Sequence, residues 1–428
     1  MASDRNAQPG ASRLRQGLNK RYRRERRFRA YGIAAIAFGL VALLVLFADI
    51  IGKGWPAFQQ TQIQLEISWD REDLGIDRVS DSELEQANFD ALIKQALQER
   101  FPGVDARRQQ HQLFKLFSSE AGYNLRERLQ AHPEVLGTTE TVALIANSTV
   151  DMYMKSGAEK RAEDRQITEL QRQWIAELRD SGQLGLGLNT SFFTQGDSRN
   201  AEQAGILGAL MGSFYTMAVT LLLSFPIGVA AAIYLEEFAP KNRLTEIIEV
   251  NINNLAAVPS IIFGLLGLAV FINFFGLPRS VPLVGGLVLT LMALPTIIIS
   301  SRSAIKAVPP SIREAALAMG ASRMQVVMHH VLPLALPGML TGTIIAMAQA
   351  LGETAPLLMI GMVAFIADVP QGFTDSATVL PVQVYLWSNT PEESYVALTS
   401  AAIMVLLAFL VTMNTLAVVL RKKLEQRW

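Results

Sequence analysis

The chain has 428 residues, 38 of them basic and 38 acidic, and 50% of its residues are hydrophobic. The balanced charge excludes a nucleic-acid-binding protein, which would need a basic surplus to neutralise phosphates, and so apolar a composition argues against an ordinary soluble enzyme. The lack of cysteine excludes disulfides and thiolate metal sites, and the four histidines show no zinc-binding spacing.

Six stretches with at most one charged residue are each long enough to cross a bilayer as a helix, which needs about 20 residues. In chain order they are 31–48, 203–235, 250–278, 280–301, 334–366 and 394–420. Backbone groups cannot stay unpaired in lipid, and these runs are too long for barrel strands, so each run predicts a helix. We therefore expect an all-α polytopic membrane protein with six transmembrane helices.

Basic residues gather in alternate segments between these runs. If residues 1–30 are cytoplasmic, the four inside segments hold 20 basic and 8 acidic side chains, whereas the outside loop after Ile366 holds four acids and no base. Basic loops stay in the cytoplasm, so we expect both the segment 1–30 and the tail 421–428 to be cytoplasmic. A signal peptide is the alternative for the basic start, but no small-x-small cleavage site follows, and Trp55 suits an interfacial anchor. A first transmembrane helix at 31–51 is favoured.

A polar stretch of 153 residues, 52–204, separates the first and second runs and carries 24 acidic and 17 basic side chains. This is the size and composition of a water-soluble domain. Apolar and polar residues alternate from Ile63 to Trp69, which predicts a strand, and Leu184–Phe193 is consistent with a second. Apolar residues recur at helical steps over 89–97 and 167–178. We expect an inserted α+β domain, and the predicted orientation makes it extracytoplasmic (periplasmic).

The segment 302–333 carries its own helix signals. Pro309-Pro310 precedes Ser311, and Ser311 with Glu314 has the spacing of a capping box, which predicts a helix start. Gly320 is placed to end that helix, after which Ser322 can open another that runs to Leu332-Pro333. No G-x-x-x-x-G-K-[S/T] phosphate loop occurs in the chain, so any ATP hydrolysis has to come from a partner, and we expect neither enzyme activity nor a bound cofactor here.

Glu353 is the only carboxylate of the fifth run. An ionisable group at the centre of a membrane helix costs about 2.5–3.5 kcal/mol on insertion scales, so Glu353 is expected to face a bundle interior or an aqueous path. The alternative is a protonated or paired carboxyl that locks helices together. Pro356 removes a backbone hydrogen bond just past Glu353 and predicts a kink there.

The segment 302–333 resembles the E-A-A loop of ATP-binding-cassette (ABC) importer permeases in its Glu314-Ala315-Ala316, its Gly320 and its Leu332-Pro333. It departs from the pattern at His330, where an aliphatic residue is usual. The resemblance implies a helix that docks in a groove of the ATPase. The residues implied in this ATPase coupling are Arg313, Glu314, Ala315, Ala316 and Gly320. The alternative is an ordinary loop helix with Glu314 as its cap.

Three further strings resemble the PstA-type permeases of phosphate ABC importers: G-E-T-A-P at Gly352–Pro356, Tyr234–Pro240 and Asn254–Gly267. The resemblance runs from about Gly205 to the carboxyl terminus. It implies a type I ABC-importer permease core with five transmembrane helices over 205–420. The shortest members of the family have a much smaller loop where this chain has 52–204.

Many related permeases carry arginine four residues before the G-E-T glutamate, where this chain has Gln349. Positions four apart share a helix face, so an Arg–Glu pair is missing and the positive partner of the anion has to come from Arg279, Arg302 or a companion permease. Anchoring at the membrane interface is the alternative for both arginines. Coulomb repulsion of phosphate by Glu353 is avoided if Glu353 is protonated or holds a companion arginine. The residues implied in the translocation path are Glu353, Gln349, Thr354, Ser260, Arg279 and Arg302.

The resemblance implies the transmembrane permease subunit of an ATP-driven inorganic phosphate importer in the bacterial inner membrane. It implies as partners a second, PstC-type permease, a PstB-type ATPase dimer that carries ATP and Mg, a periplasmic PstS-type phosphate-binding protein and the lipid bilayer. Two alternatives stay open. One is import of another oxyanion, such as sulfate or molybdate, because the coupling loop is common to such importers. The other is a membrane-anchored sensor or interaction protein, against which stand six spans and the lack of a cytoplasmic output domain.

Overall fold

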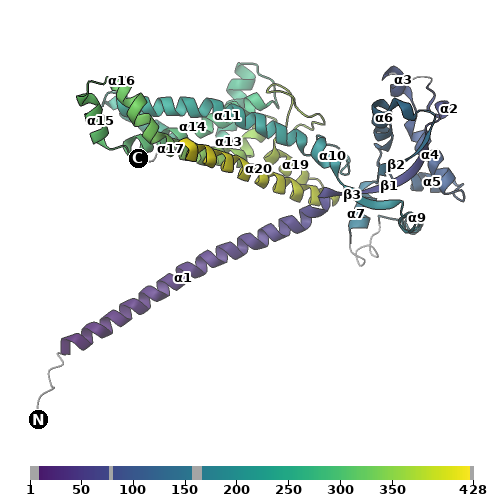
Figure 1. Cartoon of the computed structure of the whole chain (residues 1–428), viewed down its shortest axis with the longest axis horizontal. Coiled ribbons are helices and arrows are strands. Elements are labelled where there is room, and N and C mark those ends of the chain that lie inside the picture. Colours follow the sequence, from purple (N-terminus) through teal and green to yellow (C-terminus); the bar gives the residue numbers. More distant parts are fainter. Residues whose placement is uncertain (1–8, 77–80, 157–165, 425–428) are drawn as a thin grey trace, which may run out of the picture. The chain divides into compact units, whose positions relative to one another are not determined.

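The computed structural model describes residues 9–76, 81–156 and 166–424 (Figure 1). The outermost parts of the two expected cytoplasmic termini, 1–8 and 425–428, lie outside these residues. Helix α1 (Pro9–Gly54) is described by itself, because residues 54–428 form a separate compact unit. α1 is continuous, so the expected span at 31–48 is one part of a longer helix that begins within the basic segment.

A three-stranded antiparallel sheet organises the segment after α1, with strand order β2-β1-β3. The central strand β1 (Gln59–Ser68) pairs with β2 (Thr139–Ile145) on one side and β3 (Leu184–Leu188) on the other. The alternation that predicted the first strand is confirmed, since Ile63, Leu65 and Ile67 all point into the core. The expected second strand is only half right: β3 stops at Leu188, and α10 (Thr190–Thr194) begins where Asn189 caps it.

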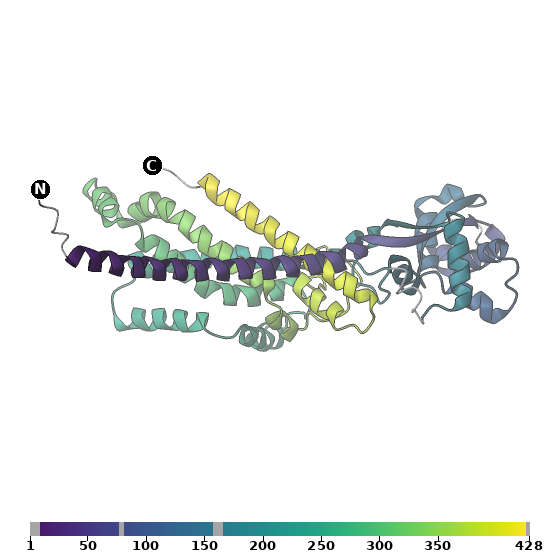
Figure 2. The same ribbon diagram turned by 90° about the horizontal axis from the view of Figure 1, so that it is seen from below.

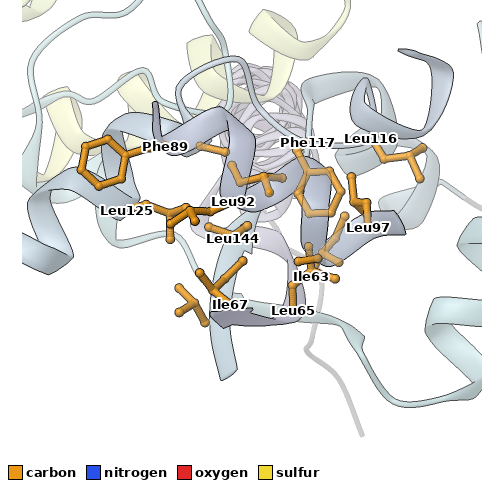
Figure 3. Packing of buried hydrophobic residues seen from close by; sticks show 14 of the residues in the cluster. Ile63, Leu65, Ile67, Phe89, Leu92, Leu97, Leu116, Phe117, Leu125 and Leu144 are labelled. Carbon is orange, nitrogen blue, oxygen red and sulfur yellow. The ribbon is translucent and has the colours of Figure 1, made fainter. Parts of the chain in front are cut away.

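Helices cover this sheet and bury its apolar face. In chain order they are α2 (Arg71–Leu74), α3 (Asp81–Gln86), α4 (Phe89–Arg100), α5 (Arg107–Phe114), α6 (Ala121–Ala131), α7 (Ser148–Lys155) and α9 (Glu169–Asp180). The two predicted helices are confirmed as α4 and α9. Figure 3 shows the resulting core, in which Leu92 and Leu97 of α4 gather with Ile63 and Leu144 of the sheet.

Five helices in the described part of the chain are long and apolar enough to cross a membrane. They cover Arg21–Phe58, Leu207–Phe238, Pro282–Lys306, Arg323–Gly352 and Ser394–Lys423. Their main elements after α1 are α11 (Leu207–Ile233), α14 (Pro282–Lys306), α17 (Leu332–Gly352) and α20 (Ser394–Leu424). The sequence prediction of a multi-span helical membrane protein is confirmed in this form. α11 and α14 pack closely because Gly286 leaves no side chain between them: a Cβ there would lie 2.5 Å from Cβ of Val219.

The third expected span, 250–278, is not one straight helix. The chain forms α12 (Arg243–Ala256) and then α13 (Ser260–Gly267), which continues as the π-helix η4 (Leu268–Phe274). The two halves are bent by 102° (Figure 2). Pro259 causes the break, because proline has no amide hydrogen to donate and disfavours helical geometry at the residue before it. Counting charges could not reveal this, since the break lies inside an uncharged run.

The fifth expected span, 334–366, is displaced toward the amino terminus. Helix α16 (Arg323–Val326) passes through the π-helix η5 (Val327–Val331) into α17, so the helix does not stop at Leu332-Pro333 as predicted. A wide π turn removes the need for the amide hydrogen that Pro333 lacks. At the other end α17 stops at Gly352, and the chain resumes as the short helix α18 (Ala355–Met359). The short helix α19 (Leu380–Ser388) precedes α20.

Candidate transport and coupling site

Glu353 lies at the break between α17 and α18, not inside a helix as expected. Its backbone is extended (φ −79°, ψ 117°), and Thr354 precedes the first turn of α18. Both side chains are half-buried. Among the described residues, none forms a hydrogen bond or ion pair with the Glu353 carboxyl group. The expected kink at Pro356 is therefore a full interruption, at which the Glu353 amide bonds to the Ala350 carbonyl while its carboxyl group has no partner among the described residues.

The broken segments α13 and α18 pack directly against each other. Gly264 makes this possible, because a Cβ on it would lie 2.7 Å from both the Cα and the carbonyl oxygen of Pro356. Ser260 is the first residue of α13 and lies one helical turn before this contact. Ser260 begins α13 and Thr354 precedes α18, so the structure brings the two helices together. Both of these residues were assigned to the path from the sequence.

The three remaining path residues lie in different surroundings. Gln349 is exposed on the last turn of α17. Arg279 is exposed in the loop before α14, next to the turn at Gly361 that follows α18: a Cβ on Gly361 would lie 3.8 Å from Cβ and Cδ of Arg279. Ser280 reinforces this neighbourhood by donating a hydrogen bond to the Gly361 carbonyl.

Arg302 is already paired with carboxylates. Its guanidinium lies 2.7 Å from Glu249 and 3.5 Å from Glu236, and only 12% of its side chain is exposed. These contacts tie α14 to α12 and to the π-helix η3 (Tyr234–Phe238) that ends α11. Arg302 thus has its charge neutralised within the protein, whereas Arg279 has no carboxylate partner among the described residues.

The coupling segment is a short helix with a defined end. Helix α15 (Pro310–Ala318) begins right after Pro309, so Ser311 already lies inside its first turn and the predicted Ser311–Glu314 capping box does not form. Gly320 takes φ +87°, and the amides of Gly320 and Ala321 bond to the carbonyls of Leu317 and Ala316, as predicted for a glycine-terminated helix. Ser322 then opens α16 through a capping box with Gln325.

Arg313 anchors α15 to the end of α11. Its guanidinium donates to the Glu237 carboxylate at 2.8 and 3.1 Å, and also to the carbonyls of Val308 and Ile305 at 2.7 and 2.9 Å. Sequence reasoning assigned Arg313 to a partner subunit and missed Glu237. Glu237 is the second glutamate of the Tyr234–Pro240 string, and it lies 76 residues before Arg313 in the sequence. That glutamate was the only sequence signal for the pair.

The outer face of the coupling segment is apolar and exposed. Met319 is 88% exposed and Leu317 is 48% exposed, and Met324 and Met328 of the following helix are also exposed. We call these four residues the coupling surface. Glu314 and Ala315 are exposed as well, whereas Ala316 is buried against the bundle. Exposed methionine and leucine on an anchored short helix provide an adaptable apolar surface for a protein partner.

Two buried carboxyl groups lie at the junction 196–206, between the sheet-containing segment and α11. Asp197 accepts a hydrogen bond from Nε1 of Trp387 at 2.9 Å, and Glu202 is almost fully buried. Burial raises the pKa of both carboxyl groups above their usual values. In the folded protein these groups therefore keep their protons to higher pH than in the unfolded chain.

The raised pKa of Glu202 predicts that rising pH weakens the junction. Between the usual glutamate pKa of 4.5 and the raised pKa, the folded chain binds more protons than the unfolded chain, so stability falls as pH rises through that window. We expect Glu202→Gln to flatten this fall in thermal unfolding of the protein in lipid nanodiscs. Glu66→Gln, which changes an exposed carboxylate on β1, is the control. An unchanged pH profile in Glu202→Gln would contradict the expectation.

Two family descriptions match the chain. "Binding-protein-dependent transport system inner membrane component" matches residues 224–428, which contain both helix breaks and the coupling segment. "Domain of unknown function (DUF3333)" matches residues 15–164.

Similar proteins are also membrane permeases, in agreement with the first of these two family matches. The phosphate transport system permease protein PstA of Haemophilus influenzae is 31% identical over 227 residues, which are 53% of this chain and 79% of that protein. The probable ABC transporter permease protein YqgI of Bacillus subtilis is 37% identical over 171 residues, 40% of this chain; the match spans only 58% of YqgI. A solved structure of the MetNI methionine ABC transporter gives a TM-score of 0.42 at 21% identity, covering 50% of this chain and 95% of that chain.

Proposed function

Because the chain belongs to the PstA-type family of ABC importer permeases, we propose that it is the phosphate-conducting permease subunit of an ATP-driven importer. The observation that carries the proposal is the G-E-T-A-P string at the α17–α18 break, packed against the second broken segment through Gly264 and Pro356. Interrupted helices leave backbone amides and carbonyls unpaired at membrane depth, which is tolerated only in a protein interior or an aqueous cavity. A break flanked by the half-buried side chains of Glu353 and Thr354 suits a path for a hydrated anion.

In this proposal Glu353, Thr354 and Ser260 line the path, with Gln349 near its edge. Arg279 supplies positive charge near the Gly361 turn, because its guanidinium has no carboxylate partner among the described residues. Arg302 does not meet the anion but holds α14 in position through Glu236 and Glu249. Repulsion of the anion by Glu353 is avoided where the carboxyl group holds an arginine of the companion permease.

The coupling surface is proposed to dock on a PstB-type ATPase dimer, which binds ATP and Mg. Motion of α15 reaches the bundle through the Arg313–Glu237 pair, since that pair ties α15 to the end of α11. A PstC-type permease completes the path, and a PstS-type binding protein delivers phosphate from the other side. Alternation between inward- and outward-facing states gives the transport its direction.

The location and orientation follow from the basic segments. We propose that the chain is a multi-pass protein of the bacterial inner membrane with both termini in the cytoplasm. The sheet-containing segment then lies in the periplasm as an inserted α+β domain. Reporter fusions after Glu246 and after Ile366 should read inside and outside respectively, which the reverse pattern would contradict.

Labelled-phosphate uptake tests the proposed function in cells that lack this chain. Wild type should restore phosphate uptake, and sulfate and molybdate should compete poorly. Glu314→Arg should lower uptake at least about tenfold, because it reverses the charge beside the apolar coupling surface; a tenfold loss corresponds to about 1.4 kcal/mol. Glu353→Gln should alter uptake while the complex still assembles.

Glu246→Arg is the matched control for Glu314→Arg, since it reverses an exposed carboxylate on α12 and should leave uptake unchanged. Co-purification of an ATPase with wild type separates a permease from a membrane-anchored sensor. Sulfate or molybdate competing as well as phosphate would overturn the substrate assignment and leave an importer of another oxyanion.

A further inference from the structure

A cleft of about 450 Å³ lies between α4, α5 and the connection that joins them. The volume falls within the range of small-molecule sites, about 300–1,000 Å³. The cleft belongs to the sheet-containing segment, and every residue that lines it lies between Lys94 and Phe114. Neither the transport path nor the coupling surface uses any of these residues.

The floor of the cleft is apolar and rigid. Leu97, Phe101 and Leu113 are buried members of the same core that holds the sheet, and Val104 and Phe114 pack against it. Phe101 also packs against Trp174 of α9, with the two ring centroids 6.3 Å apart. Aromatic rings held in this way offer a fixed surface for an apolar group of a ligand.

The polar lining of the cleft carries two positive charges. Lys94 and Arg107 line it together with the imidazole of His111 and the amides of Gln98 and Gln110, and no carboxylate does. Lys94 Nζ lies 5.1 Å from the centre of the Phe114 ring, so charge and apolar floor are adjacent. Gln110 is oriented by a hydrogen bond that its Nε2 donates to the Val104 carbonyl at 3.2 Å.

The basic side chains of the cleft lack carboxylate partners within the described residues, unlike the arginine next to them. Arg100, at the end of α4, pairs with Glu177 at 2.8 Å and bonds to Gln183 at 2.7 Å. Lys94, Arg107 and His111 form no such pair, although acidic residues outnumber basic ones in 52–204. Unneutralised like charges around one cleft attract an anion, which relieves their mutual repulsion.

We propose that this cleft binds a small organic phosphate monoester, with the phosphate held by Lys94, Arg107 and His111 and an apolar group resting on Phe101 and Phe114. A dianion matches several cations better than a carboxylate does, because each cation adds a Coulomb contribution. The apolar floor distinguishes such a ligand from inorganic phosphate. The proposal is independent of the transported substrate, since the cleft lies apart from the path residues.

Equilibrium dialysis of n-hexyl phosphate tests this with the full-length protein in nanodiscs of zwitterionic lipid. We expect saturable binding with a Kd below about 0.1 mM that weakens as salt is raised. Arg107→Glu should weaken binding at least about tenfold, because it reverses one of the two permanent positive charges of the cleft. Arg71→Glu is the matched control, since it reverses an exposed arginine of the same segment outside the cleft.

A second variant and three competitors keep the test decisive. Val104→Trp fills the cleft without changing charge and should also abolish binding at an unchanged unfolding temperature. If hexanol or inorganic phosphate competes as well as unlabelled hexyl phosphate, the proposal is overturned. Either the phosphate or the hexyl group would then contribute nothing to the affinity. Equal competition by hexanoate would overturn the preference for a dianion. No saturable binding up to about 1 mM would overturn the site itself, whatever the outcome of phosphate uptake.

Discussion

Arg313→Glu is expected to lower phosphate uptake at least about tenfold, and adding Glu237→Arg should restore a large part of it. The single change places two carboxylates where the guanidinium now bonds to Glu237, and it leaves the carbonyls of Val308 and Ile305 without their donor. Hydrogen bonds to a charged group contribute about 1.5–3 kcal/mol, so α15 loses its attachment to α11. The double variant re-forms the charge pair without the carbonyl bonds, so rescue is expected to be partial.

The matched control is Lys241→Glu, which reverses an exposed charge close to Glu237 in sequence. It should leave uptake unchanged. Uptake is compared at equal membrane levels of the protein, measured by immunoblot, so that loss of folding is not mistaken for loss of coupling. A double variant no better than Arg313→Glu alone would show that the pair does not transmit motion from the coupling segment.

Gly264→Ala is the second change with a large expected effect, again a loss of uptake of at least about tenfold. The new Cβ would meet the Cα and carbonyl oxygen of Pro356 at 2.7 Å and the Cβ of Met359 at 2.9 Å. Two of these three atoms are backbone atoms, so no side-chain rotation relieves the clash and α13 has to move away from α18. Overpacking of this kind costs about 1–3 kcal/mol, which thermal unfolding in nanodiscs should also record.

Gly103→Ala is the control for this variant, because a Cβ at Gly103 has no heavy atom within 4 Å and the backbone there does not require glycine. Its uptake and unfolding temperature should match those of wild type. Wild-type uptake in Gly264→Ala would mean that the two broken helices do not need to touch, which would remove the contact from the proposed path.

The membrane spans were predictable because charged side chains are unfavourable in the hydrocarbon core of a bilayer. Spans therefore stand out in the sequence as long runs without charged residues. This pattern locates helices without showing where they break. Pro259 interrupts one run and Glu353–Thr354 another, and for the second the sequence predicted only a kink at Pro356, not a full interruption. The sequence did not predict strand β2. Its first three residues are polar, and only its last four residues are apolar.

The coupling segment was predictable at positions where one residue type strongly favours one backbone role, such as a helix end or a helix cap. Gly320 at positive φ and Ser322 as a cap are of this kind. The Ser311–Glu314 prediction was wrong because the helix accepts Pro310 in its first turn and so begins before Ser311. Glu237 could not be assigned, since an ion pair over 76 residues of sequence depends on tertiary packing.

The 102° bend between α12 and α13 bears on the number of membrane crossings. With both termini in the cytoplasm, as proposed, that number is even, whereas the straight helices supply five. Each leg of the bent pair is only about 20 Å long at 1.5 Å per residue, short of a hydrocarbon core of about 30 Å. The number of crossings becomes even when the two legs count together as one span, so the parity of the proposed topology depends on the turn at Pro259.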